Sequence, residues 1–207
     1  MPSRNTIKID VPDSYYHIYA RGASKQPIFL DDSDYAYFIG LFERYLEPGL
    51  KLSPTKVAYP NFANAVQLLA FCLMGNHFHL LVHQSERGSM TGYMRCVMTS
   101  YSRYFNHKYK RTGSLFESRY KASRIDNDIY LQHISRYIHL NPRFWKRYQY
   151  SSYRSYIDPK LRATMPWLSP EKIIDLFDTP LAYAYFVADY EDVKAMFEEV
   201  KYDLADQ

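Results

Sequence analysis

Residues 71–83 decide the fold, and they read Phe-Cys-Leu-Met-Gly-Asn-His-Phe-His-Leu-Leu-Val-His. Leu, Phe and Val dominate this stretch, which predicts a buried β-structure rather than a helix. Gly75-Asn76 divides it and is typical of a tight turn. We therefore expect two strands, Val66–Leu73 and Phe78–His83, although a single bulged strand would also fit the pattern.

Two histidines, His77 and His79, stand one residue apart in the second of these segments. Side chains alternate between the two faces of a strand, so both imidazoles should point the same way, with their Cα atoms ~6.7 Å apart. Two imidazoles at this spacing can bind one metal ion. The alternative is a structural role, in which each buried ring needs hydrogen-bond partners for its nitrogens.

The rest of the chain predicts an α+β fold, a mostly antiparallel sheet with helices packed on it. The segment 47–64 contains three prolines and is expected as a loop, and residues 112–113 as a turn. Candidate N-caps are Ser33 or Asp34 for the first helix and Asp128 for the last, which should stop before Pro142. The remaining expected elements are, in order, a strand Tyr15–Arg21, a helix Asp34–Leu46, a helix Ser89–Lys108, a strand Tyr120–Ile125 and a helix Ile129–Leu140.

Length and composition favour one cytoplasmic domain with an appendage. A chain of 207 residues can bury a substantial hydrophobic core without disulfide bonds or metal ions to stabilise it. Its two cysteines, Cys72 and Cys96, are far apart and do not suggest a disulfide framework. No leader opens the chain, and no apolar run approaches the ~18 residues of a membrane span. We therefore expect no contact with a membrane.

Charge is distributed unevenly along the chain. Residues 95–147 contain twelve Lys and Arg residues against three acids, a net charge of +9, and aromatic residues alternate with the basic ones in residues 101–111. Basic side chains can bind phosphates, and aromatic rings can stack on unpaired bases. This composition therefore favours binding of single-stranded nucleic acid. The alternative is a solvated helix face with its aromatics in the core. The candidate DNA-binding residues are Arg103, Lys108, Lys110, Arg111, Arg119, Lys121 and Arg136.

The C-terminal part has the opposite charge. Residues 171–207 hold three lysines and ten acids, a net charge of −7. Apolar residues recur among these acids and predict two short helices that dock by their apolar faces. These apolar residues are Ile173, Ile174, Leu176, Phe177, Tyr185, Phe186, Val193 and Phe197.

The helix before Pro142 carries the second group of candidate site residues. His133, Tyr137 and Asn141 follow one another at intervals of four and so share one helical face. A tyrosine, with a reference pKa near ~10, needs a polarised electrophile close by to act as a nucleophile. An Asn one turn later offers an oxygen ligand to a metal. The alternative for Tyr137 is that it packs the helix on the sheet.

Four runs of this sequence resemble the motifs of REP-associated tyrosine transposases, a branch of the single-tyrosine HUH transposases. Two of them correspond to the signature motifs of that family, namely residues 73–82 (Leu-Met-Gly-Asn-His-Phe-His-Leu-Leu-Val) and 136–142 (Arg-Tyr-Ile-His-Leu-Asn-Pro). The other two lie between them, at residues 100–106 and 111–121. The likeness covers residues 14 to 157 in the right order.

The resemblance implies roles for four residues. His77 and His79 would be the paired metal ligands, Asn141 a third ligand, and Tyr137 the catalytic nucleophile. The ion implied is Mg²⁺ or Mn²⁺. Imidazole nitrogens, however, are softer ligands than oxygens, and two of them would favour zinc or nickel. The implied fold is a ferredoxin-like sheet of five antiparallel strands flanked by helices. Residues 1–157 would form the transposase domain and residues 158–207 an acidic helical C-terminal extension.

The function implied is nicking and strand transfer of single-stranded DNA at hairpins formed by palindromic repeats. Tyr137 would attack a phosphodiester by transesterification and form a 5′-phosphotyrosine, without an organic cofactor. The protein would act as a monomer or homodimer. Two alternatives remain open, a catalytically inactive nucleic-acid-binding regulator and a metal-dependent hydrolytic nuclease.

Overall fold

A four-stranded antiparallel sheet forms the centre of this computed structural model, which describes residues 10–189. The strand order is β2-β3-β1-β4, and the predicted α+β class is confirmed. Residues 75–76 join β2 to β3, so the sequence 66–84 forms two strands and not one. The strands are β1 (Ser14–Arg21), β2 (Val66–Met74), β3 (His77–Gln84) and β4 (Lys121–Ile125).

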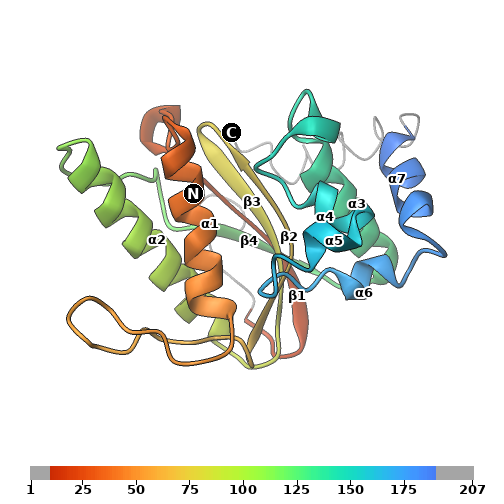
Figure 1. Ribbon diagram of the computed structural model, residues 1–207, viewed down its shortest axis with the longest axis horizontal. Helices are drawn as coiled ribbons and strands as arrows, with labels where there is room; N and C mark the ends of the chain where they lie inside the picture. Colours follow the sequence, from red (N-terminus) through yellow and green to blue (C-terminus); the bar gives the residue numbers. More distant parts are fainter. Residues whose placement is uncertain (1–9, 190–207) are drawn as a thin grey trace, which may run out of the picture.

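Helices cover both faces of the sheet. The long helices α1 (Asp32–Leu46) and α2 (Ser89–Lys108) lie on one face, and α3 (Asp128–Leu140) lies on the other (Figure 1). Within residues 10–189, no helix is both long and apolar enough to cross a bilayer. The short helices near α3 are η2 (Trp145–Arg147), α4 (Tyr153–Ile157), α5 (Pro159–Arg162), α6 (Glu171–Ile174) and α7 (Pro180–Ala188); η1 (Ala23–Lys25) follows β1.

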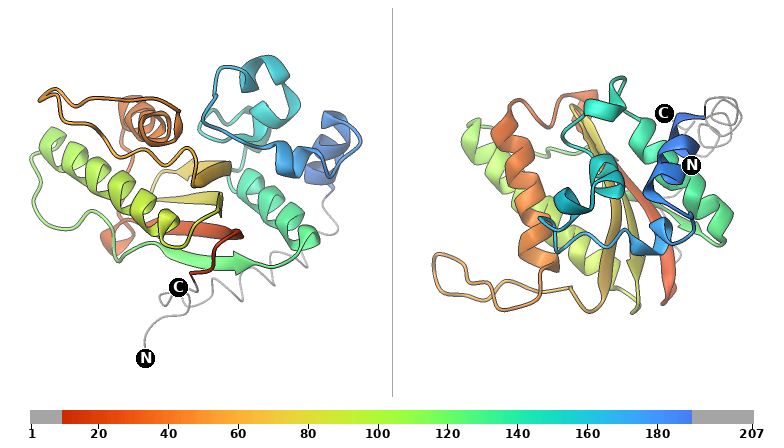
Figure 2. Two further views of the ribbon diagram at one scale, coloured as in Figure 1. Left: turned by 90° about the horizontal axis from the view of Figure 1, so that it is seen from below. Right: turned by 45° about the vertical axis from the view of Figure 1, so that its right-hand side comes forward.

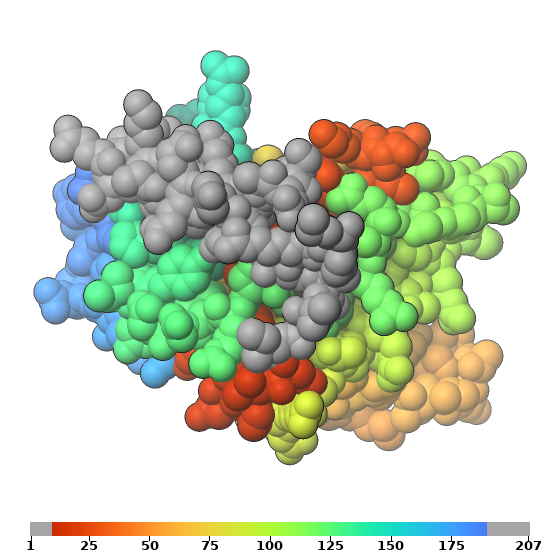
Figure 3. Space-filling view, turned by 180° about the vertical axis from the view of Figure 1, so that it is seen from behind, coloured from red at the N-terminus to blue at the C-terminus, as the bar shows by residue number. Residues whose placement is uncertain are grey.

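The two views of Figure 2 show this three-layer arrangement from other sides, with the sheet between the two groups of helices. Seen from behind, the green residues around β4 and the start of α3 lie next to the red residues that begin the described chain (Figure 3). This is the proximity that the antiparallel pairing of Tyr15 in β1 with Ile125 in β4 requires. Strand β4 therefore forms one edge of the sheet.

Side chains alternate along β3 between the two faces of the sheet, as predicted, and each face has its own core. Phe78, Leu80 and Val82 pack with residues of α1 and α2. Leu81 points to the opposite face and packs with residues of α3 and the C-terminal helices. His77 and His79 share the face of Leu81, because they too stand at odd positions of the strand.

The sheet has four strands in residues 10–189, not the five that the resemblance implied. The outer edge of β2 is instead covered by two segments that run beside it for a single residue each, at Ser151 and Leu168. The backbone of Ser152 donates to the carbonyl of Phe71 at 3.0 Å, and the chain then turns into α4. These segments satisfy edge groups of β2 without forming a ladder.

Both predicted N-caps were wrong by a few residues. Helix α1 begins at Asp32, and its cap is Asp31, whose carboxylate accepts from the backbone N–H of Asp34. The Asp34 carboxylate accepts in return from the backbone of Asp31, which completes a capping box. Helix α3 begins at Asp128, and its cap is Asn127.

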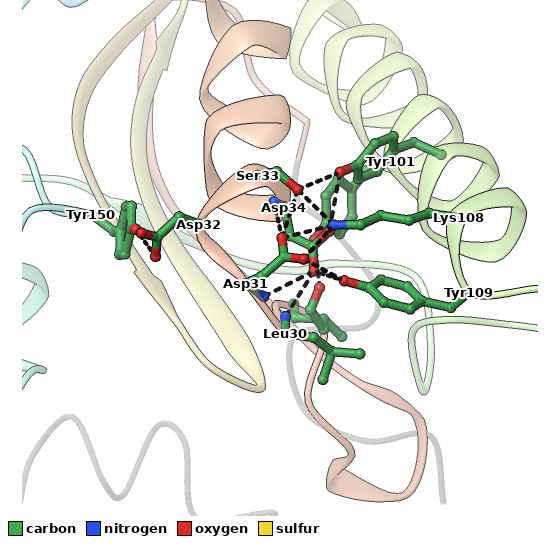
Figure 4. A network of polar contacts seen from close by, with 11 residues as sticks. Leu30, Asp31, Asp32, Ser33, Asp34, Tyr101, Lys108, Tyr109 and Tyr150 are labelled. Atoms are coloured by element: carbon green, nitrogen blue, oxygen red, sulfur yellow. Dashed lines mark hydrogen bonds and ion pairs between the residues drawn. The ribbon is translucent and has the colours of Figure 1, made fainter.

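Lys108, at the end of α2, joins this helix to the start of α1 (Figure 4). Its Nζ lies 2.7 Å from one carboxylate oxygen of Asp31, 2.8 Å from the other, and 2.7 Å from Oδ1 of the buried Asp34. The hydrogen bond from Lys108 holds the pKa of Asp31 well below its usual range. The charge of Lys108 is thus paired within the protein, and the side chain that we expected to bind DNA joins two helices.

Replacing Lys108 should therefore affect stability. We expect Lys108→Met to lower the midpoint of thermal unfolding by roughly 5 °C, because Asp31 and Asp34 lose the cation between them. Lys110→Met is the matched control, since Lys110 is exposed and two residues away. Equal midpoints for the two variants, measured by circular dichroism, would contradict this role.

The described part of the C-terminal extension shares the core of the domain. The predicted boundary at 157/158 falls between α4 and α5, yet Ile173, Tyr183 and Val187 are fully buried in the core that contains α3. Helices α6 and α7 thus dock by apolar residues, as predicted, although Tyr185, which was expected among them, is exposed; Val193 and Phe197 lie outside the described residues. Residues of α6 and α7 therefore pack in the same core as α3.

A buried polar network also attaches α7 to α3. The Tyr183 hydroxyl lies 2.7 Å from Nδ1 of His139 and 3.1 Å from Oγ of Ser135. The second ring nitrogen of His139 lies 2.8 Å from Oγ of Ser152, and burial lowers the pKa of this histidine to about 3, so that it is neutral. Every polar group of this ring is satisfied within the protein.

Removing one hydroxyl tests how strongly α7 is attached. We expect Tyr183→Phe to lower the free energy of unfolding by about 1–3 kcal/mol, because the buried His139 and Ser135 each lose a hydrogen-bond partner. Tyr185→Phe, at a side chain that is 69% exposed on the same helix, should have no effect. The measurement is urea unfolding of both variants; no difference between them would mean that the network does not hold α7.

Candidate active site

Two elements bring the predicted site residues together. Strand β3 contributes His77 and His79, the C-terminal half of α3 contributes Tyr137, and Asn141 is the residue that caps the end of α3. The ring centres of His77 and His79 are 5.0 Å apart, and those of His79 and Tyr137 are 5.4 Å apart. Nε2 of His77 lies 3.3 Å from Oδ1 of Asn141. The structure thus places all four residues in one cluster.

The donor atoms of this cluster suit a cation. Nδ1 of His77 lies 2.7 Å from Oδ1 of Asn76, an oxygen that can only accept, so Nδ1 carries the proton and Nε2 presents its lone pair. That lone pair faces Oδ1 of Asn141, a second acceptor, and a positive ion would satisfy both. Within the described residues, no three His, Cys, Asp or Glu side chains group to hold a metal.

Both histidines are in the protonation state that a metal ligand needs. Burial lowers the pKa of His77. Burial also brings the pKa of His79 well below its ordinary value, and the neighbouring His17 and His77 add to this effect. Neutral imidazoles offer a free lone pair at neutral pH.

Sequence reasoning missed one member of the cluster, His17 of β1. Nε2 of His17 lies 2.9 Å from Nδ1 of His79, and both rings are buried. The ring centre of His17 also lies 5.7 Å from that of Tyr137. In the sequence, Tyr15, His17 and Tyr19 alternate along the expected first strand. This alternation puts them on one face of the sheet, and it is the face that also carries His77 and His79. Only the β1–β3 pairing reveals this neighbourhood.

The contact with His17 fixes the ring of His79, as hydrogen-bond partners of ligating histidines commonly do. We expect His17→Phe, which keeps a buried ring, to weaken Mn²⁺ binding by the DNA-free protein about 10- to 100-fold. Isothermal titration calorimetry measures this directly. His107→Phe, at an exposed histidine of α2, is the control. Wild-type Mn²⁺ affinity in His17→Phe would show that His79 does not depend on this partner.

Tyr137 is nearly buried, with 6% of its surface exposed. Burial raises its pKa to about 12, while a hydrogen bond with the side chain of Asn141 acts in the opposite direction. The phenol is therefore protonated at neutral pH in the DNA-free protein. It becomes a good nucleophile only if positive charge is brought to its oxygen.

A cavity of about 280 Å³ opens next to this cluster. Its wall contains the histidine pair and Tyr137, and basic side chains at its rim come from β1, β4 and the segment before β4. At that rim Arg21 pairs with Glu117 at 3.3 Å. The lining residues are Tyr19, Ala20, Arg21, Asn76, His77, His79, Glu117, Ser118, Arg119, Lys121 and Tyr137.

The remaining candidate DNA-binding residues lie on or just after α2 and on or just before β4. Arg119 and Lys121 line the cavity, and Arg103 lies on α2 and is exposed. Lys110 is exposed beyond the end of α2. Arg111 is partly buried and lies 5.5 Å from the ring centre of Phe105.

Arg136 cannot serve as predicted, because its side chain is fully buried. Its guanidinium donates to the carbonyl of Phe186 at 3.2 Å and lies 4.2 Å from the centre of that ring. It also lies 2.8 Å from Nδ1 of His133. Arg136 and His133 therefore attach α7 to α3, and His133 does not join the cluster around Tyr137 although it lies on the same helix.

Comparisons with known proteins agree with this fold. Residues 59–141 match the family model described as "Transposase IS200 like", a range that contains His77, His79, Tyr137 and Asn141. A solved structure of a REP-associated tyrosine transposase bound to a REP hairpin is 12% identical, has a TM-score of 0.52, and is matched over 75% of this chain and 86% of that one.

A second solved structure, of a candidate transposase from Deinococcus radiodurans R1, is 13% identical over 67% of this chain and 95% of that one, with a TM-score of 0.39. No curated protein matches the chain. The chain thus shares the fold of the solved REP-associated tyrosine transposase, and its residues 59–141 are similar to IS200-like transposases. The match over residues 59–141 supports the family predicted from the motifs of the sequence.

Proposed function

We propose that this protein nicks single-stranded DNA at hairpins and transfers the strand by transesterification, with Tyr137 as the nucleophile. The observation that carries the proposal is the position of Tyr137, whose ring lies 5.4 Å from that of His79 at the wall of a cavity with basic residues at its rim. A phosphate drawn into this cavity would meet Arg119 and Lys121. It would also lie beside the phenol.

His77, His79 and Asn141 are the residues that would hold a divalent ion, Mg²⁺ or Mn²⁺. When bound, such an ion supplies positive charge next to the scissile phosphate and acts as a Lewis acid. The three protein ligands are neutral, so they do not reduce that charge. His17 holds the His79 ring in place, and Asn76 holds that of His77.

The reaction exchanges one phosphodiester for another. The oxygen of Tyr137 loses its proton and forms a bond to phosphorus, while the bond from phosphorus to the 3′ oxygen of the preceding nucleotide breaks. That oxygen takes up a proton and leaves as a free 3′-hydroxyl, and the 5′ side stays attached as a phosphotyrosine. Attack by a 3′-hydroxyl on this linkage restores the phenol and joins two DNA ends, so no nucleotide cofactor is consumed.

Hairpin DNA is the substrate that this proposal favours. The similar REP-associated tyrosine transposase was solved with a REP hairpin, and its fold is shared over most of both chains. The basic rim of the cavity and the net charge of +9 in residues 95–147 suit a polyanion.

A denaturing gel tests the proposal. The protein is incubated with a labelled single-stranded hairpin oligonucleotide and Mn²⁺ or Mg²⁺. We expect a covalent protein–DNA adduct that survives denaturation and a released fragment with a 3′-hydroxyl. Cleavage without an adduct would mean a hydrolytic nuclease, and binding without cleavage would mean a DNA-binding regulator; either result would contradict the proposal.

A further inference from the structure

A pair of opposite charges lies in the wall of the cavity beside Tyr137. Arg21 is the last residue of β1, and Glu117 lies in the segment that leads into β4. Nε of Arg21 lies 3.3 Å from Oε2 of Glu117, and Nη2 lies 3.3 Å from Oε1. Their side chains are 20% and 32% exposed, so a substrate in the cavity can reach both of them.

The backbone holds Arg21 directly opposite one of the two histidines of the site. Arg21 and His77 are partners in the antiparallel pairing of β1 with β3. Side chains of such partners point to the same face of a sheet, with their Cβ atoms about 5 Å apart. The next residue, Gly22, begins a turn so tight that a Cβ there would lie 2.1 Å from the carbonyl oxygen of Gln26. Arg21 is therefore fixed beside His77 by main-chain geometry.

Glu117 does not suit a cavity that attracts phosphate. Among the lining residues, which all belong to the described range 10–189, it is the one acid beside the cations Arg21, Arg119 and Lys121. Main-chain contact places it there, since the backbone N–H of Glu117 donates to the carbonyl of Arg21 at 3.0 Å. A carboxylate at this point opposes the binding of a polyanion that the rest of the wall favours.

The carboxylate of Glu117 occupies Arg21 in the way that a phosphate would. Carboxylates and phosphates both offer two oxygens to the fork of a guanidinium. The two contacts of 3.3 Å are longer than the ~2.8 Å that is usual between opposite charges, and a partly exposed pair of this kind contributes little to stability. A phosphate that enters the cavity can therefore take the place of the carboxylate.

We propose that Arg21 is a catalytic residue that contacts the non-bridging oxygens of the scissile phosphate, and that Glu117 occupies it until DNA displaces the carboxylate. This inference rests on the proposed function, because that function supplies the phosphate. When the oxygen of Tyr137 bonds to phosphorus, negative charge develops on the non-bridging oxygens before the 3′ oxygen leaves. The fixed charge of Arg21 stabilises this state more than the resting phosphodiester. Arg21 itself neither gains nor loses a proton.

Single-turnover cleavage, with the protein in excess, separates this role from DNA binding. The full chain is incubated with a labelled single-stranded hairpin oligonucleotide and Mn²⁺, and the covalent adduct is measured over time. We expect the double variant Arg21→Gln with Glu117→Gln to form the adduct about 30-fold more slowly, because it lacks the cation and leaves no unpaired acid behind. Lys25→Gln, at an exposed lysine outside the cavity, is the control and should react at the wild-type rate.

Glu117→Gln alone should act in the opposite direction. In EDTA, fluorescence anisotropy should show an affinity for the hairpin about 3- to 10-fold above that of wild type, because no carboxylate competes for Arg21. Its adduct should form at least as fast as that of wild type. A pair with a purely structural role would give a different result, since either single substitution would then impair the protein alike. Circular dichroism shows whether each variant is folded.

Three results would overturn the inference. They are a double variant that reacts as fast as wild type, a Glu117→Gln variant that loses activity as Arg21→Gln does, and an unchanged affinity of Glu117→Gln for the hairpin. A wild-type protein that forms no adduct would refute the proposed function instead. The affinity measurement in EDTA would then still show whether Glu117 covers a phosphate site.

Discussion

Tyr137→Phe abolishes both the covalent adduct and the nicking of hairpin DNA, and this is the largest effect we expect. The substitution removes only the hydroxyl, so the ring still packs against His17 and His79. Without the phenolic oxygen no bond to phosphorus can form. Strand cleavage should fall by at least about a thousandfold, to the background of the assay. A denaturing gel and a cleavage time course measure the two losses.

Tyr19→Phe is the matched control, because Tyr19 lines the same cavity. It should leave the adduct in place. If the adduct persists in Tyr137→Phe and disappears in Tyr19→Phe, then Tyr19 is the nucleophile. The assignment of Tyr137 would also fail if Tyr137→Phe lost its adduct yet still cut DNA, since water would then be the attacking group.

His77→Ala should have the second largest effect. Nε2 of His77 faces Oδ1 of Asn141, so the substitution removes one of three ligands from the proposed ion site. We expect cleavage to fall by at least about a hundredfold, because the ion is lost or displaced. Affinity for the hairpin in EDTA should stay within about twofold of wild type, since phosphate contacts supply most of it.

His83→Ala controls for the loss of a histidine from the same face of β3. His83 points the same way as His77 but pairs with Asp13 at 2.8 Å, away from the cluster. Its removal should not change cleavage. An active His77→Ala, or equal losses in both variants, would show that the histidine pair does not act as an ion site.

The sequence predicted the helices and strands well where the local pattern of residues alone determined them. Residues 89–108 have helical periodicity throughout and form α2 with the predicted bounds. Alternation in residues 77–84 placed His77 and His79 on one face, and spacing by four placed Tyr137 and Asn141 on another. These two faces meet in the structure.

What the sequence could not predict depends on contacts between distant segments. His17 joins the cluster only because β1 pairs with β3, 62 residues away. The sequence predicted Arg136 and Lys108 as surface cations for DNA, but Arg136 is buried against Phe186 and Lys108 is paired with Asp31. Residues 10–189 also contain no fifth strand, because the chain that approaches β2 at Ser152 turns into α4 instead of continuing beside β2.

The docking of α7 on α3 has a consequence for the order of events during synthesis. Helix α3 carries Tyr137, and its buried polar residues, Arg136 and His139, find their partners on residues 183–186. A ribosome has to make about fifty further residues after Tyr137 before those partners exist. Since domains fold as the chain emerges, the nucleophile would be held firmly only late in translation. If Tyr137 acts as we propose, a nascent chain would gain a firmly held nucleophile only after residues 183–186 have emerged.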